Sequence, residues 1–177
     1  MKNIFFNTNT QKVLRFFIQN PTQFLLASDV IKNTNISRAG INFALRELLK
    51  EGLIQKEAKG KAYIYRVESE LSVLKQLKVL DSVMKLHPLV KKIESLAEKI
   101  ILFGSCARGE NTEDSDIDLM MISHNKDEIK DGLCQFKKLP IKSMIKTPIE
   151  FADLEKKDPT FYLEITRGIV LFEKNNE

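Results

Sequence analysis

Two aspartates are the residues of this sequence whose type and spacing most directly suggest chemistry. Asp116 and Asp118 stand two positions apart, at the start of an apolar run that continues to Ile122. Because side chains alternate along a strand, the two carboxylates would share one face and lie roughly 6 to 7 Å apart. Carboxylates this close repel each other unless a hard divalent cation takes them as oxygen ligands. We therefore expect Asp116 and Asp118 to be the ligands of a Mg²⁺ ion.

A phosphate-binding turn is expected shortly before the aspartates. Residues 100–103 are an apolar run typical of a buried strand, and the run ends in Gly104 and Ser105, ten residues before Asp116. Gly104 lets a phosphate approach the backbone, and Ser105 with the amides that follow can donate hydrogen bonds to phosphate oxygens. Arg108 adds a planar set of donors suited to phosphate. A phosphate cradle next to a metal pair is the outline of a nucleoside triphosphate site.

This pattern has a known counterpart. Gly-Ser, ten residues and Asp-x-Asp resemble the signature of the polymerase β-type nucleotidyltransferases, and GSCARG followed by SDIDL is similar to the minimal members of that superfamily. The resemblance covers residues 98–172. It implies a Mg²⁺-dependent transfer of a nucleoside monophosphate, with AMP from ATP expected, to an acceptor hydroxyl with release of pyrophosphate. It also implies catalytic and metal-binding roles for Asp116 and Asp118, and nucleotide-binding roles for Gly104, Ser105 and Arg108.

The same family usually has a third carboxylate on a neighbouring strand, where it completes a second metal site. The strand expected at residues 141–146 contains none. Glu150 is the nearest substitute, provided that the strand runs on through residues 149–151. However, Thr147 to Glu150 also has the order of a helix capping box, which explains Glu150 without chemistry and is the interpretation we prefer. Catalysis thus depends on a residue that the pattern does not identify.

The N-terminal part of the chain differs in charge from the rest. Residues 1–67 carry 11 Lys or Arg and 4 Asp or Glu, whereas the remainder carries 17 and 20. A concentration of positive charge favours a polyanionic partner, such as double-stranded DNA. The sequence therefore predicts different ligands for its two parts.

Three helices and a hairpin are expected in the basic part. Helical periodicity and end signals place helices near residues 10–20, 27–32 and 37–52, and two strands at 53–57 and 63–67 enclose a basic turn. Residues 10–67 resemble a winged helix-turn-helix, whose third helix would read the major groove and whose wing would contact phosphate. The residues expected to contact DNA are Ser37, Arg38, Ala39, Asn42 and Arg46 on the helix, and Lys59 and Lys61 on the wing. The alternative is a protein-binding or dimerisation module whose basic face is simply solvated.

The predicted fold class is α+β. Residues 1–68 form the winged helix-turn-helix domain, residues 69–97 a helical connector broken by Pro88, and residues 98–177 a small nucleotidyltransferase-like α/β domain with a mixed sheet flanked by helices. After the second strand of that domain we expect a helix at 126–138, a strand at 141–146, two capped helices and a last short strand at 169–172. The leucine-rich face of the connector could pair with a second copy, and palindromic DNA would favour such a homodimer.

Two hypotheses of function follow. The first is an enzyme that transfers a nucleotide and is coupled to DNA binding, possible acceptors including a partner toxin, as in the antitoxin-type members of the family. The second is a DNA-binding transcriptional regulator whose nucleotidyltransferase-like domain only senses nucleotide or mediates assembly. The N-terminus, MKNIFF, does not resemble a signal peptide, and no apolar run approaches membrane-spanning length, so no membrane partner and a cytoplasmic location are expected.

Overall fold

The structure is a computed structural model that describes residues 4–174. The first three residues of the predicted domain 1–68 and the last three of the predicted domain 98–177 lie outside the described residues. The fold divides into unit 1, Met1–Lys78, and unit 2, Val79–Glu177. The division falls inside one long helix, α4 (Ser72–Ile93), so the chain passes from one unit to the other without an exposed loop.

Unit 1 has three helices and a small antiparallel sheet. The helices are α1 (Asn9–Gln19), α2 (Ala27–Thr34) and α3 (Arg38–Lys50), and the strands are β1 (Leu25–Leu26), β2 (Ile54–Lys59) and β3 (Ala62–Val67). The strands lie in the order β1-β3-β2. This order of elements is consistent with a winged helix-turn-helix. The strand β1 was not predicted, because two residues are too short to show an alternating pattern.

Local signals explain the helices of unit 1. Thr8 and Gln11 form a capping box at the start of α1, and the hydroxyl of Ser37 accepts a hydrogen bond from the Gly40 amide at the start of α3. Each helix turns an apolar stripe inward, comprising Val13, Leu14, Phe17 and Ile18 on α1 and Ile41, Ala44, Leu45 and Leu48 on α3. The predicted periodicity of both helices is thus confirmed.

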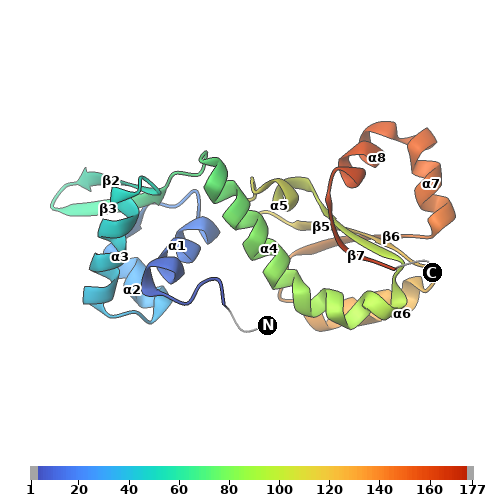
Figure 1. Cartoon of the computed structure of the whole chain (residues 1–177), viewed down its shortest axis with the longest axis horizontal. Coiled ribbons are helices and arrows are strands. Elements are labelled where there is room, and N and C mark those ends of the chain that lie inside the picture. Colours follow the sequence, from blue (N-terminus) through green and yellow to red (C-terminus); the bar gives the residue numbers. More distant parts are fainter. Residues whose placement is uncertain (1–3, 175–177) are drawn as a thin grey trace. The chain divides into compact units, whose positions relative to one another are not determined.

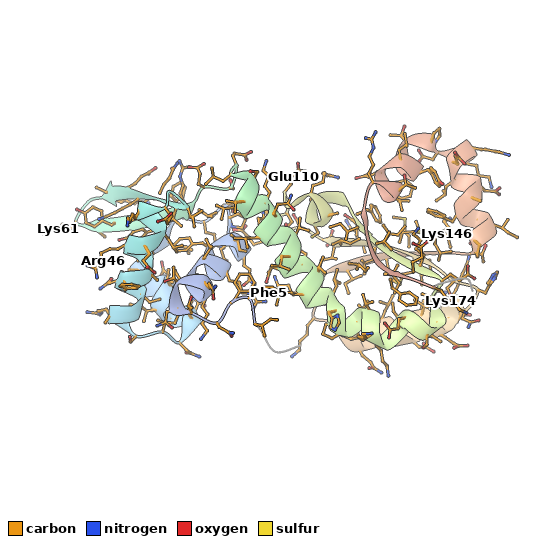
Figure 2. All side chains as sticks on the ribbon, viewed as in Figure 1. Phe5, Arg46, Lys61, Glu110, Lys146 and Lys174 are labelled. Atoms are coloured by element: carbon orange, nitrogen blue, oxygen red, sulfur yellow. The ribbon has the colours of Figure 1, made fainter. Side chains whose placement is uncertain are left out.

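The hairpin of unit 1 also forms as predicted. Strands β2 and β3 pair from Ile54 with Val67 to Lys59 with Ala62, and the turn between them contains Gly60 at φ +63°. Only glycine adopts this backbone conformation at low cost, so the turn is tight. Figure 2 shows Lys61 at the tip of this hairpin. The wing therefore projects a basic residue at its tip.

The prediction that Pro88 ends the connector helix was wrong. Helix α4 continues from Ser72 to Ile93 with Pro88 inside it, followed by a short 3₁₀ turn at Glu94–Leu96. Proline removes one hydrogen bond of the helix, but Leu86 before it and Leu89 after it are fully buried. Packing on both sides of Pro88 therefore outweighs the lost hydrogen bond.

Unit 2 is built on a four-stranded mixed sheet in the order β6-β5-β4-β7. Strands β5 and β6 are parallel, whereas β4 pairs antiparallel with β5 and with β7. The elements are β4 (Lys99–Phe103), α5 (Gly104–Arg108), β5 (Ile117–Ile122), α6 (Lys126–Leu133), a 3₁₀ turn (Cys134–Phe136), β6 (Ile141–Lys146), α7 (Pro148–Lys157), α8 (Pro159–Thr166) and β7 (Ile169–Glu173). The predicted helix at 126–138 is thus shorter, and only its first eight residues are α-helical.

Helices cover both faces of this sheet, as Figure 1 shows. One face, with Ile100, Leu102, Leu119 and Met121, packs against α4 and α6. The other face, with Ile101, Phe103, Met120 and Ile122, packs against α7 and α8. Because both faces are buried, β4 and β5 are continuous apolar runs instead of alternating ones. The predicted α+β class, with a mixed sheet flanked by helices, is confirmed.

Among residues 4–174, no helix has the length and apolar character that crossing a membrane requires.

Candidate functional site

The turn between β4 and α5 places Gly104 directly against Asp118. Gly104 is buried and has φ +69°, a conformation that other residues adopt only with strain. A Cβ atom added at Gly104 would lie 2.5 Å from Oδ2 of Asp118. Both the backbone and the neighbouring carboxylate therefore require glycine at this position, and Ser105 follows it as a half-buried residue of α5.

The two aspartates flank a buried residue at the start of β5. Asp118 pairs with Phe103 across the antiparallel ladder, and this pairing places it beside the turn that follows β4. Ile117, between the aspartates, packs into the cluster on the α4 and α6 face of the sheet. By alternation, Asp116 and Asp118 lie on the other face, the one toward α8. The structure thus brings the aspartates and the glycine–serine turn together.

Lys142 closes this group from the neighbouring strand. It lies on β6 in register with Asp118, and its Nζ is 2.6 Å from Oδ2 of Asp116. The lack of a carboxylate on this strand was evident from the sequence, but the ion pair was not predicted. The parallel pairing of β5 and β6, which places Lys142 here, cannot be deduced from local patterns.

Burial and charge act in opposite directions on Asp118. Burial raises the pKa of its carboxyl group above the usual value, and the negative charges of Asp116 and Glu164 raise it further. The positive charges of Lys142 and Arg108 oppose this shift. The hydrogen bond to Asp116 in turn raises the pKa of the Lys142 ammonium group. A cation beside this pair of carboxylates is therefore favoured electrostatically.

Arg108 is held by two acidic side chains. Its Nε lies 2.7 Å from Oε2 of Glu110, and its Nη1 lies 3.4 Å from Oε1 of Glu164 on α8. The hydrogen bond that Arg108 donates to Glu110 is the main reason why the pKa of Arg108 is raised. Neither acid was anticipated from the sequence. Glu164 is more than fifty residues away from Arg108 along the chain. The two acids therefore compete with any phosphate for the guanidinium group of Arg108.

A pocket of about 400 Å³ opens beside the turn, between α5 and α8. Ala107 and Leu163 give it apolar walls, while the side chains of Arg108, Glu164 and Arg167 are charged. Thr160, Gly104 and Gly168 complete the lining. The pocket is thus large enough for part of an organic ligand and adjoins the residues expected to bind phosphate. It was not predicted from the sequence, since its walls come from two distant segments.

Comparison with known proteins agrees with this geometry. The family described as polymerase beta nucleotidyltransferase matches residues 84–177, more than half of the chain. The chain belongs to the polymerase beta nucleotidyltransferase family. The matched residues include the turn, both aspartates, Lys142 and the whole pocket.

One curated relative is "Putative protein adenylyltransferase MJ1379" of Methanocaldococcus jannaschii. The two sequences are 42% identical over 48 residues, which are 27% of this chain and 48% of the relative. The chain therefore spans about half the length of the curated relative it matches.

Two solved structures have weaker likeness. One is described as a "putative nucleotidyltransferase" from Sulfolobus solfataricus, with 17% identity and a TM-score of 0.35 over 55% of this chain and 88% of that chain. The other is TrmBL2, described as an archaeal chromatin protein, with 14% identity and a TM-score of 0.33 over 90% of this chain and 72% of that chain. TM-scores this low do not support a conclusion about function.

Glu150 does not complete the candidate site. It forms a capping box with Thr147 at the start of α7, as predicted, and its carboxylate also pairs with Lys126. These contacts lower the pKa of Glu150 to about 2, the hydrogen bond from Lys126 contributing most. Among residues 4–174, no group of three or more His, Cys, Asp and Glu side chains is placed to hold a metal ion.

The donor set nevertheless fits Mg²⁺ in combination with a nucleotide. Proteins commonly bind Mg²⁺ through one or two carboxylates while substrate phosphates supply further oxygens. Asp116 and Asp118 provide two such carboxylates, and Oδ2 of Asp118 lies directly against the Gly104 backbone, where a Cβ atom would not fit. The residues present thus suit one Mg²⁺–nucleotide complex better than a pair of protein-bound ions.

In unit 1, the residues expected to contact DNA are all exposed, namely Ser37, Arg38, Ala39, Asn42, Arg46, Lys59 and Lys61. Figure 2 shows Arg46 projecting from α3 and Lys61 from the hairpin tip. The hydroxyl of Ser37 already caps α3, so this side chain is partly committed to the fold. Phe43, also on α3, has 53% of its surface exposed and was not anticipated as part of this face.

Proposed function

We propose that this protein is a Mg²⁺-dependent nucleotidyltransferase that transfers AMP from ATP to an acceptor hydroxyl group and also binds double-stranded DNA. The observation that carries the enzymatic part is the contact between Gly104 and Asp118, with Asp116 two residues earlier on the same face. In this arrangement, the turn could bind phosphate and the two carboxylates could bind a metal ion on one and the same triphosphate. Membership of the nucleotidyltransferase family supports the same conclusion.

The residues around the turn divide the binding of the nucleotide between them. The backbone at Gly104 and Ser105 would bind phosphate oxygens, and Arg108 would turn from its acidic partners to the same phosphates. The pocket beside α8 would take the nucleoside, because it adjoins Gly104 and has apolar walls at Ala107 and Leu163. These contacts would fix the α-phosphate near the acceptor.

Asp116 and Asp118 would hold Mg²⁺, which, when bound, neutralises charge on the triphosphate. In the reaction, the acceptor oxygen forms a bond to the α-phosphorus, and the bond from that phosphorus to the departing pyrophosphate breaks. The hydroxyl proton must leave the acceptor oxygen. Either aspartate carboxylate could accept that proton.

A protein acceptor is favoured by the M. jannaschii relative, whose name specifies adenylylation of proteins. The aligned segment is short, so the proposal for this chain is a class of acceptor: a hydroxyl-bearing side chain of a partner protein. A partner toxin modified by this protein would agree with an antitoxin-type role.

The enzymatic proposal is tested by incubating the full chain with α-labelled ATP, Mg²⁺ and proteins from its own cells. We expect label to be transferred to a protein, and Asp116→Asn to abolish the transfer. Asp114→Asn is the matched control, because Asp114 is an exposed aspartate in the same loop. Transfer that persists in Asp116→Asn would contradict the proposal.

The DNA-binding part rests on unit 1. Unit 1 carries a net charge of +7 and unit 2 one of −3, and the basic residues of α3 and the hairpin are exposed. We propose that α3 lies in the major groove and the hairpin contacts phosphate, with two copies of the chain binding a palindromic site. Arg38→Ala should weaken binding, whereas Lys12→Ala on α1 should not. Equal effects of both substitutions would contradict this orientation.

A second function is favoured by the composition of β6. Because Lys142 stands where a further carboxylate would be needed and Glu150 caps α7, the domain could bind ATP without transferring AMP. The protein would then be a transcriptional regulator whose affinity for DNA depends on nucleotide. MgATP binding without transfer to any protein, combined with a change in DNA affinity when ATP is added, would favour this alternative.

A further inference from the structure

The position of Lys142 has a consequence for the metal site. Lys142 is the partner of Asp118 in the parallel ladder between β5 and β6, so its side chain leaves the sheet beside that of Asp118. Its ammonium group lies 2.6 Å from Oδ2 of Asp116. One positive charge of the chain itself therefore occupies space between the carboxylates and the neighbouring strand.

We propose that Lys142 acts as a built-in cation: it neutralises Asp116, prevents Mg²⁺ from binding before the nucleotide, and limits the site to one divalent ion that arrives with the triphosphate. This inference rests on the proposed nucleotide site. It assigns Lys142 a positioning role that determines the order and number of metal ions, instead of a role in the chemical step.

The charges explain why metal alone should bind weakly. Without nucleotide, a divalent ion at Asp116 would lie a few ångströms from the ammonium group and would be repelled by it. Such repulsion is of the order of 1 kcal/mol for each pair of unit charges at 4 Å in water and larger near a protein surface. The two aspartates alone must then offset both this repulsion and the loss of the water ligands of the ion.

The exposure of the ion pair between Lys142 and Asp116 explains how the nucleotide allows the metal ion to bind. The side chain of Lys142 is 68% exposed and that of Asp116 is 39% exposed, so the pair is largely in solvent and is readily broken. A triphosphate brings oxygen ligands for the ion and negative charge for the lysine. Lys142 can therefore leave Asp116 for a phosphate oxygen while the ion takes its place.

Binding of Mn²⁺ to the full chain, followed by the electron paramagnetic resonance signal of free Mn²⁺, tests this inference with and without a non-hydrolysable ATP analogue. In the wild-type protein, the analogue should strengthen Mn²⁺ binding strongly. Lys142→Ala and Lys142→Gln should strengthen binding of Mn²⁺ alone by roughly tenfold and so reduce the effect of the analogue. Lys142→Glu should bind a second Mn²⁺ ion. Lys146→Ala is the matched control on the same strand and should behave as the wild type.

The outcomes separate this inference from the proposed function. If neither Lys142→Ala nor Lys142→Gln strengthens Mn²⁺ binding, while Asp116→Asn still weakens binding of Mn²⁺ with the analogue, the role of Lys142 is refuted and the nucleotide site remains. If Asp116→Asn and Asp118→Ala bind Mn²⁺ with the analogue as the wild type does, the proposed site fails, and the inference fails with it. Thermal melting of each variant identifies any loss of folding.

Discussion

The two units of this protein present their charged residues in opposite ways. In unit 1 the basic side chains of α3 and the hairpin are exposed and directed away from the core. In unit 2 the charged residues around the candidate site contact one another: Arg108 with Glu110 and Glu164, and Asp116 with Lys142. Apart from Arg66, which pairs with Glu57, the basic residues of α3 and the hairpin are thus open to a polyanion, whereas a ligand of unit 2 would compete with internal ion pairs.

This difference predicts different responses to substitution. In unit 1, the loss of one residue should remove about one ionic contact and leave the others unchanged. In unit 2, removing one residue also frees its partner. Some substitutions in this site should therefore weaken ligand binding and others should strengthen it.

The largest effect is expected from Gly104→Ala. The new side chain would have to adopt φ +69°, which costs about 1 to 3 kcal/mol, and it would also press on the Asp118 carboxylate. We expect MgATP affinity to fall by about a hundredfold, measured by isothermal titration calorimetry. Gly60→Ala is the control, since Gly60 has φ +63° but no atom within 4 Å of the added Cβ. It should lower stability without changing MgATP binding; equal MgATP affinities of the two variants would contradict the proposed site.

The next effect concerns salt and unit 1. Raising NaCl from 50 to 200 mM should lower the affinity for a DNA duplex by at least about tenfold, because each phosphate contact releases a counterion. Lys61→Ala should lower the slope of log K against log salt by about one. Fluorescence anisotropy would measure both effects, with Arg108→Ala in unit 2 as the control. DNA binding that is insensitive to salt would exclude the ionic surface proposed for unit 1.

A smaller effect should arise from Glu164→Gln. This substitution frees Arg108 from one acidic partner and removes a negative charge near Asp118. Because an exposed ion pair contributes about 0.2 to 1 kcal/mol, MgATP affinity should increase by up to about fivefold. Glu155→Gln, at an exposed position of α7, should have no effect. Weaker binding by Glu164→Gln would show that Glu164 assists the ligand instead of competing with it.

The smallest effect is expected from Glu150→Gln, which retains an oxygen for the capping box but removes the charge that pairs with Lys126. The pKa of Glu150 is lowered to about 2 in the folded protein, so its charge stabilises the fold above its ordinary pKa of 4.5. This stabilisation is lost as the pH falls from about 4.5 toward 2. The wild type should therefore melt slightly above Glu150→Gln at pH 6, and the difference should disappear near pH 2. A difference that is constant over this range would contradict the assignment.

Features encoded by local patterns could be predicted from the sequence. The stripe of α3, the capping box at Thr147 and the glycine between two apolar runs each depend on residues a few positions apart. The α+β class follows from the order of such patterns along the chain. The glycine and aspartates of the motif were recognisable because their spacing between two apolar runs resembles the signature of the polymerase β-type nucleotidyltransferases.

Features that depend on long-range packing could not be predicted. Pro88 indicates a break, and only the burial of Leu86 and Leu89 explains why α4 continues. Likewise, the partners of the candidate site, Lys142 and Glu164, come from the register of a parallel strand and from the docking of α8. The residues that could bind the ligand were thus identifiable from the sequence, whereas the residues that form ion pairs with them were not.

The central claim is that Asp116, Asp118 and the turn at Gly104 form one site for a Mg²⁺-bound triphosphate. It is tested most directly by calorimetric titration of ATP, in the presence and absence of Mg²⁺, into the wild type, Asp118→Ala and the control Asp114→Ala. We expect the wild type and Asp114→Ala to bind ATP only with Mg²⁺. Asp118→Ala should lose this binding while melting close to the wild-type temperature. An unchanged affinity of Asp118→Ala for MgATP would contradict it.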